Sequence, residues 1–196
     1  MKARGLLVLG LVVTAALARA DLVFSNIEAT VTFDNQTTFD LDVDENGHEI
    51  DFTAGSVPIF ISSESEFSTA FVEISYDAST TGETINQLDL IFSGWTMGGG
   101  EIRYSEAVFD SGDNEVARVE GLVDGDTPFV QSDTLTFDGL TEYSVVKTFT
   151  LVLGPNEVGP SIASMGIVEQ NAVPEPATMG ALAIGALGLL ARKRRK

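Results

Sequence analysis

The chain has 196 residues, a formal net charge of −18, no cysteine and one histidine. The lack of cysteine excludes disulfides, thiolate metal sites and thiol nucleophiles, and one histidine cannot build a multi-histidine zinc site. Residues 21–172 contain 28 acidic and three basic residues, a formal charge of −25. Such a surface repels nucleic acids and attracts divalent cations or basic partners, so nucleic-acid binding is excluded.

The first twenty residues, MKARGLLVLGLVVTAALARA, have the organisation of a secretory signal peptide. Lys2 and Arg4 come first, an uncharged stretch follows, and Ala18 and Ala20 supply the small-x-small cleavage pattern. The uncharged stretch is too short for a comfortable membrane span. We therefore expect export through the Sec translocon and cleavage by signal peptidase, with a mature chain that starts at Asp21.

Residues 21–172 are predicted to form one antiparallel β-sandwich domain. Short segments that alternate apolar and polar residues recur, separated by clusters of Gly, Asn, Asp and Ser. In YSVVKTFTLVLG, residues 143–154, the odd-numbered positions from Val145 to Leu153 share one side, which also carries Lys147. This period of two is typical of antiparallel strands, and no helical periodicity occurs between the two termini. About ten short strands favour a jelly-roll-like or immunoglobulin-like sandwich over a barrel.

The stretch FDLDVDENGHEIDF, residues 39–52, is the strongest candidate for a metal site. From Asp42 it follows the pattern Asp-x-Asp-x-Asn-Gly that opens the EF-hand calcium loop, but the twelfth position is Thr53 instead of glutamate. A calcium site of another type remains as the hypothesis, and its expected ligands are Asp40, Asp42, Asp44, Asn46 and Asp51. The alternative is a β-hairpin that turns at Asn46 and Gly47, with its acidic side chains facing water.

Trp95, the only tryptophan, lies in the glycine-rich stretch SGWTMGGG, residues 93–100. An exposed Trp95 would offer a ring for stacking on a sugar, whereas a buried one would anchor the core; burial is favoured because tryptophan is buried on average. A carbohydrate-binding module, the first alternative function, would also present Tyr76, Tyr104 and Tyr143 on one sheet face.

The chain contains neither a G-x-S-x-G nor an H-E-x-x-H pattern. We therefore expect a protein that is not an enzyme. A secreted glycoside hydrolase is the less favoured alternative, because carboxylate pairs are too abundant in this sequence for a catalytic pair to be assigned.

Residues 173–196 combine three features in order. Pro174, Glu175 and Pro176 come first, residues 177–191 are uncharged, and the chain closes with five basic residues, Arg192, Lys193, Arg194, Arg195 and Lys196. As a helix, residues 177–191 would extend roughly 22 Å against roughly 30 Å of bilayer hydrocarbon, so they span only where the bilayer thins locally. The basic tail is then expected in the cytoplasm, with the acidic domain outside.

This tail resembles the PEP-CTERM sorting signal of exported bacterial proteins, which is also labelled ice-binding protein C-terminal domain. The resemblance implies that Pro174, Glu175 and Pro176 are recognised by an exosortase and that residues 192–196 stop transfer. It further implies an inner-membrane anchor, later cleavage, and delivery to the cell surface or to an exopolysaccharide matrix of the kind found in biofilms. We therefore expect a structural or adhesive domain, with calcium as its one candidate cofactor.

Overall fold

The computed structural model describes residues 22–63, 67–125, 129–155 and 159–175, which form twelve β-strands and no helix. The strands are β1 (Leu22–Phe33), β2 (Thr38–Asp40), β3 (Asp42–Asn46), β4 (Glu49–Thr53), β5 (Ile59–Ser63), β6 (Ser68–Thr80), β7 (Ile85–Met97), β8 (Gly100–Asp110), β9 (Glu115–Val123), β10 (Val130–Leu140), β11 (Glu142–Leu153) and β12 (Ser161–Pro174).

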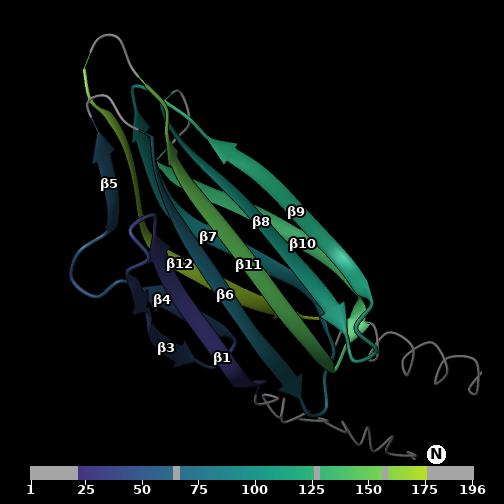
Figure 1. Ribbon diagram of the computed structural model, residues 1–196. Coiled ribbons are helices and arrows are strands. Elements are labelled where there is room, and N and C mark those ends of the chain that lie inside the picture. The colour runs from purple at the N-terminus through teal and green to yellow at the C-terminus, as the bar shows by residue number, and fades with distance from the viewer. Residues whose placement is uncertain (1–21, 64–66, 126–128, 156–158, 176–196) are drawn as a thin grey trace, which may run out of the picture.

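These strands form two antiparallel sheets packed face to face, as predicted (Figure 1). The front sheet has the strand order β2-β1-β6-β11-β8-β9, and the back sheet has the order β10-β7-β12-β4-β3. Strands β5 and β4 follow one another along the same edge of β12, β5 pairing with Ser161–Met165 and β4 with Val168–Asn171. The last long strand, β12, therefore lies in the middle of the back sheet.

Alternation along the strands builds the core. Every second residue of β11, from Tyr143 to Leu153, is buried, and the intervening residues face solvent. Side chains from both sheets meet in an aromatic cluster, in which the ring centroid of Phe92 lies 4.9 Å from that of Tyr104 and 5.0 Å from that of Phe149. Offset and edge-on ring pairs at these separations stabilise a core beyond the area that they bury.

Three polar side chains interrupt this apolar interior. Lys147, Glu106 and Gln170 are fully buried between the sheets, among the aliphatic and aromatic residues of the core. Charged side chains are almost never fully buried unless they are paired. The cluster is therefore an exceptional feature of this sandwich.

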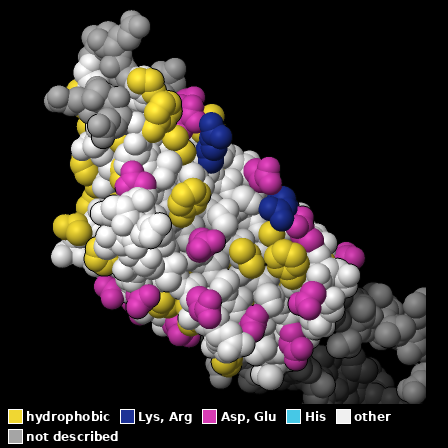
Figure 2. Space-filling model, in the orientation of Figure 1, with side chains coloured by type: hydrophobic (Ala, Val, Ile, Leu, Met, Phe, Trp, Pro, Cys, Tyr) yellow, Lys and Arg dark blue, Asp and Glu magenta, His cyan; other side chains and the backbone are white. Residues whose placement is uncertain are grey.

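The outer surface is acidic. Figure 2 shows scattered carboxylates across the visible face, with few basic side chains among them. Arg103 lies 2.8 Å from Glu101 and Arg118 lies 2.6 Å from Glu115, so each arginine is paired with an acid. The remaining carboxylates leave a strongly negative surface.

The predicted targeting segments fall outside the described residues. These segments are the signal peptide at 1–20 with Ala18 and Ala20, the membrane helix at 177–191, the basic tail at 192–196, and Pro176 of the Pro-Glu-Pro motif. Within the described part of the chain, no helix has the length and apolar character needed to cross a membrane.

Candidate functional site

The predicted calcium segment forms a β-hairpin from β3 and β4. Asn46 pairs with Glu49, so Gly47 and His48 are the two central residues of the turn. Gly47 has a φ of 67°, which suits the first central position of a type II′ turn. The hairpin alternative is therefore confirmed, although the turn lies one residue later than Asn46-Gly47.

The five proposed calcium ligands are distributed over three strands. Asp42, Asp44 and Asn46 are exposed on β3, and Asp44 lies opposite Asp51 of β4. Asp40 ends β2, which belongs to the front sheet, whereas β3 belongs to the back sheet. The fold therefore brings Asp44 and Asp51 together and assigns Asp40 to the other sheet.

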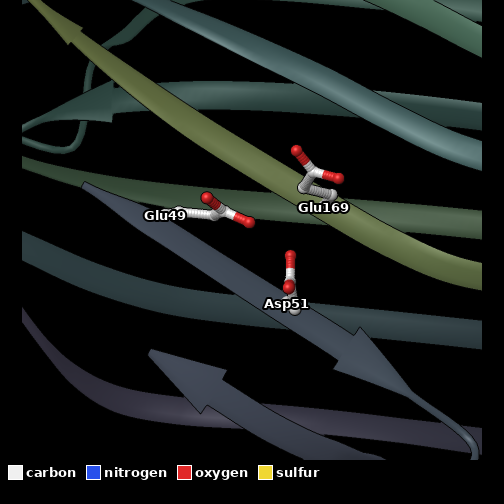
Figure 3. Close-up of side chains that lie close together, drawn as sticks. All are labelled: Glu49, Asp51 and Glu169. Atoms are coloured by element: carbon white, nitrogen blue, oxygen red, sulfur yellow. The ribbon is translucent and has the colours of Figure 1, made fainter. Parts of the chain in front are cut away.

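A different acidic cluster surrounds Asp51 on the outer face of the back sheet. Glu49 precedes Asp51 by two residues on the same face of β4, and Glu169 of β12 lies directly opposite Asp51. The three carboxylates converge in Figure 3, and one oxygen of each lies within 4.8 Å of the others. Such a group of oxygen ligands suits a hard divalent cation such as calcium.

Electrostatic repulsion within this cluster is concentrated on Asp51. Burial, followed by the charges of Glu49, Glu169 and Asp44, raises the pKa of Asp51 to about 6. Its Oδ1 atom is buried without a hydrogen-bond partner among the described residues. A bound cation or a proton would relieve both the repulsion and the missing contact.

Two aromatic side chains face solvent on the same outer face of the back sheet. Trp95 of β7 and Phe60 of β5 both pair with Ser164 of β12, one from each side. Directly paired residues point to the same face of a sheet, and Trp95 and Phe60 are 41% and 49% exposed. The interpretation of Trp95 as a core anchor was therefore wrong.

The three tyrosines point inward. Tyr76 and Tyr143 are buried, and Tyr104 packs in the core against Phe92 and Phe149. Tyr104 also donates a hydrogen bond to Asp133. Because they lie inside the sandwich, these side chains do not join Trp95 on an exposed aromatic face.

Sequence reasoning missed Glu169 and Phe60. Glu169 had no local signal, because its proximity to Asp51 depends on the pairing of β12 with β4. The exposure of Trp95 did have a signal: in β7, Leu88, Leu90 and Phe92 are buried at even-numbered positions, so odd-numbered residues point outward.

The start of the predicted sorting motif belongs to the last strand. Pro174 ends β12, where it pairs with Ile85 of β7, and the backbone N–H of Glu175 donates to the carbonyl of Thr84 at 2.9 Å. The folded domain therefore continues to Glu175 without a linker.

A family model for the PEP-CTERM protein-sorting motif matches residues 172–196. The chain carries a PEP-CTERM sorting signal. This signal implies that the protein is exported, held through its C-terminus and processed by an exosortase, as the sequence predicted. The match begins inside β12, so the PEP-CTERM segment and the folded domain overlap at residues 172–175.

No curated protein matches the sequence. Among solved structures, the carbohydrate-binding module TmCBM61 in complex with β-1,4-galactotriose has 14% identity and a TM-score of 0.37, over 75% of this chain and 88% of that one. The enzymatically active domain of bacteriophage CBA120 tailspike protein 4 has 14% identity and a TM-score of 0.35, over 80% of this chain and 20% of that one. A family 11 carbohydrate-binding module from Clostridium thermocellum has 10% identity and a TM-score of 0.25, over 83% of this chain and 94% of that one. Likenesses this distant assign no function.

Proposed function

We propose that the β-sandwich is a non-enzymatic, adhesive domain that binds an extracellular polysaccharide through the outer face of the back sheet. The PEP-CTERM signal supplies the route to the cell surface or matrix. The observation that carries the proposal is the pair Trp95 and Phe60, two exposed aromatic side chains on one sheet face. Apolar side chains that are exposed side by side, and not singly, mark interaction sites on protein surfaces.

The spacing of this pair indicates an extended ligand. Trp95 and Phe60 lie on strands two positions apart, with β12 between them, which separates their backbones by roughly 10 Å. An oligosaccharide or polymer laid across β5, β12 and β7 can contact both.

The charge of the domain restricts the class of polysaccharide. A surface with 28 acidic and three basic residues between positions 21 and 172 repels polyanions at low salt. We therefore expect a neutral polysaccharide, bound by stacking and by polar side chains such as Ser164 between the two rings.

A binding assay with matched variants tests this proposal. Retention of the full chain on insoluble or immobilised neutral polysaccharides is expected to fall at least about tenfold in Trp95→Ala and in Phe60→Ala, as for loss of a central aromatic contact. Phe71→Ala is the control, because Phe71 is equally exposed, at 48%, but lies on β6 of the front sheet. Equal binding by all three variants would overturn the proposal.

Calcium binding by Glu49, Asp51 and Glu169 is a second proposal, supported by the convergence of their carboxylates. Three carboxylates supply up to six oxygens, near the six to eight that calcium takes. We expect calcium to raise the melting temperature of the protein and a chelator to lower it. Glu169→Gln should abolish the difference, and Glu142→Gln, an exposed acid on β11, should preserve it. An unchanged wild-type midpoint would contradict the proposal.

A further inference from the structure

A lysine, a glutamate and a glutamine meet inside the sandwich. Lys147 of β11 and Glu106 of β8 are 0% exposed, and Gln170 of β12 is 1% exposed. Lys147 lies directly opposite Glu106 in the front sheet, and its Nζ is 2.8 Å from Oε1 of Glu106. The same Nζ donates to Oε1 of Gln170, which belongs to the back sheet. The amine therefore contacts both a carboxylate and a side-chain amide.

Apolar residues surround this cluster on both sheets. Ile74 flanks Lys147 on β6, and Ile50 and Leu90 flank Gln170 on β4 and β7; each is at most 1% exposed. The ring centroid of Tyr76 lies 6.0 Å from Nζ. An ion pair in such surroundings loses the hydration of both charges, and this loss can exceed the attraction between them.

Two polar atoms of the cluster have no hydrogen-bond partner. Among the described residues, Nε2 of Gln170 and Oε2 of Glu106 have no partner, whereas Oε1 of Glu106 lies 2.8 Å from Nζ of Lys147. Burial, the largest cause, lowers the pKa of Lys147, against the opposing effect of Glu106. A buried lysine with a lowered pKa has more of its neutral amine, which is the nucleophilic form.

We propose that Lys147 and Gln170 react to form an intramolecular isopeptide bond between the two sheets, with Glu106 as general base and then general acid. The Nζ lone pair attacks Cδ of Gln170, and the Nζ–Cδ bond forms. Glu106 accepts one proton from Nζ and delivers it to Nε2. The Cδ–Nε2 bond then breaks and ammonia leaves. The exchange replaces one amide by another, so it needs no oxidant, reductant or co-reactant.

The isopeptide bond would give this domain a covalent crosslink in place of a disulfide. Exported proteins commonly use disulfides for this purpose, and this chain has no cysteine. The bond joins β11 to β12, and β12 continues into Pro174 and Glu175 of the sorting signal. A pull on the C-terminus would therefore be transmitted to the front sheet through a covalent bond as well as through strand pairing.

Mass spectrometry of the full chain after expression tests the bond directly. We expect a tryptic fragment that begins at Val119, is not cut after Lys147, and is lighter than its sequence mass by one ammonia molecule. Trypsin does not cleave after an acylated lysine, so the two observations support each other. Fragmentation should join Lys147 to Gln170. Free peptides that end at Lys147, together with unmodified Gln170, would overturn the proposal whatever the behaviour of any variant.

Variants separate the chemistry from the packing. Gln170→Leu keeps the volume of the site without the amide, and it should retain the full sequence mass and be cut after Lys147. The folded fraction of Glu106→Gln should keep its full sequence mass. Complete loss of ammonia from that variant would contradict the role of Glu106. Gln87→Glu, on β7 of the same sheet but partly exposed, should lose ammonia as the wild type does. If loss persists in Gln170→Leu, the bond lies elsewhere and the assignment is wrong.

Discussion

Asp51 of β4 lies directly opposite Glu169 of β12, with the carboxylate of Glu49 converging on both. Opposite-strand side chains of like charge repel each other, and here the repulsion adds to partial burial. The pKa of Asp51 rises to about 6 as a result. The surroundings of Asp51 therefore favour a protonated carboxyl group or a bound cation. They disfavour the ionised carboxylate without a counterion at neutral pH.

This shift predicts how stability depends on pH in the absence of calcium. The pKa of Asp51 rises from 3.8 when unfolded to about 6 when folded, so between these values the folded state binds more protons than the unfolded state. Its contribution to stability is therefore fully present below about pH 4 and is lost as the pH rises through 6. Asp51→Asn should flatten this part of the curve and raise the free energy of unfolding at pH 7 by about 1 kcal/mol, after allowance for solvent screening at a half-buried site.

Chemical denaturation at several pH values, with chelator present, measures this effect. Asp138→Asn, an exposed acid on β10, is the matched control and should follow the wild-type curve. If the difference in unfolding free energy between Asp51→Asn and the wild type is the same from pH 4 to pH 7, the pKa of Asp51 is not raised in the folded protein.

The aromatic contact between the sheets predicts a large loss on truncation. Phe149 is 1% exposed and packs against Phe92 and Tyr104. Phe149→Ala should lower the free energy of unfolding by about 3–5 kcal/mol, because it removes buried area and leaves a cavity. Phe71→Ala, at an exposed position on the adjacent strand β6, should change it by less than about 0.5 kcal/mol. Similar losses in equilibrium unfolding would show that the sheets do not meet at Phe149.

A glycine at the start of β8 lies against the backbone of β12. A Cβ atom on Gly100 would overlap the carbonyl oxygen of Ile162 and lie 2.7 Å from its carbonyl carbon. Backbone atoms cannot rotate away, so Gly100→Ala should destabilise the protein by about 2 kcal/mol or more. Gly125→Ala, where a Cβ would meet nothing within 4 Å, should be close to neutral in thermal melting. A stable Gly100→Ala variant would contradict the close approach of β8 and β12.

The sequence predicted the strands well because alternation is a local property. The odd-numbered positions of β11 were assigned to one side, and they are buried in the sandwich. That same side contained Lys147, but its partners Glu106 and Gln170 could not be found from the sequence. Their meeting depends on the register of β11 with β8 and on the packing of β11 over β12.

The acidic hairpin shows the same limit. The residues around Gly47 predicted a turn there, and the sequence also showed that many carboxylates lie near it. The group that converges includes Glu169, which is far along the chain and reaches Asp51 through the pairing of β12 with β4. The abundance of acidic residues thus indicated a possible cation site, and strand pairing decided which carboxylates lie close together.

The basic tail offers a separate test of sorting. Replacing Arg192, Lys193, Arg194, Arg195 and Lys196 by alanine should weaken retention at the inner membrane, because positive charges hold a short helix in its orientation. The variant is expected in the medium with its tail uncut. Unchanged membrane retention and processing would show that these charges are not part of the signal.

The C-terminal residue of the released protein tests the central claim most directly. Cells that export the protein should yield a form whose last residue, read by mass spectrometry, lies between Pro174 and Ala177. The backbone N–H of Glu175 is hydrogen-bonded to Thr84 of the folded domain. A C-terminus at or just after Glu175 therefore leaves β12 intact. A released protein that still ends at Lys196 would contradict processing at the PEP-CTERM signal.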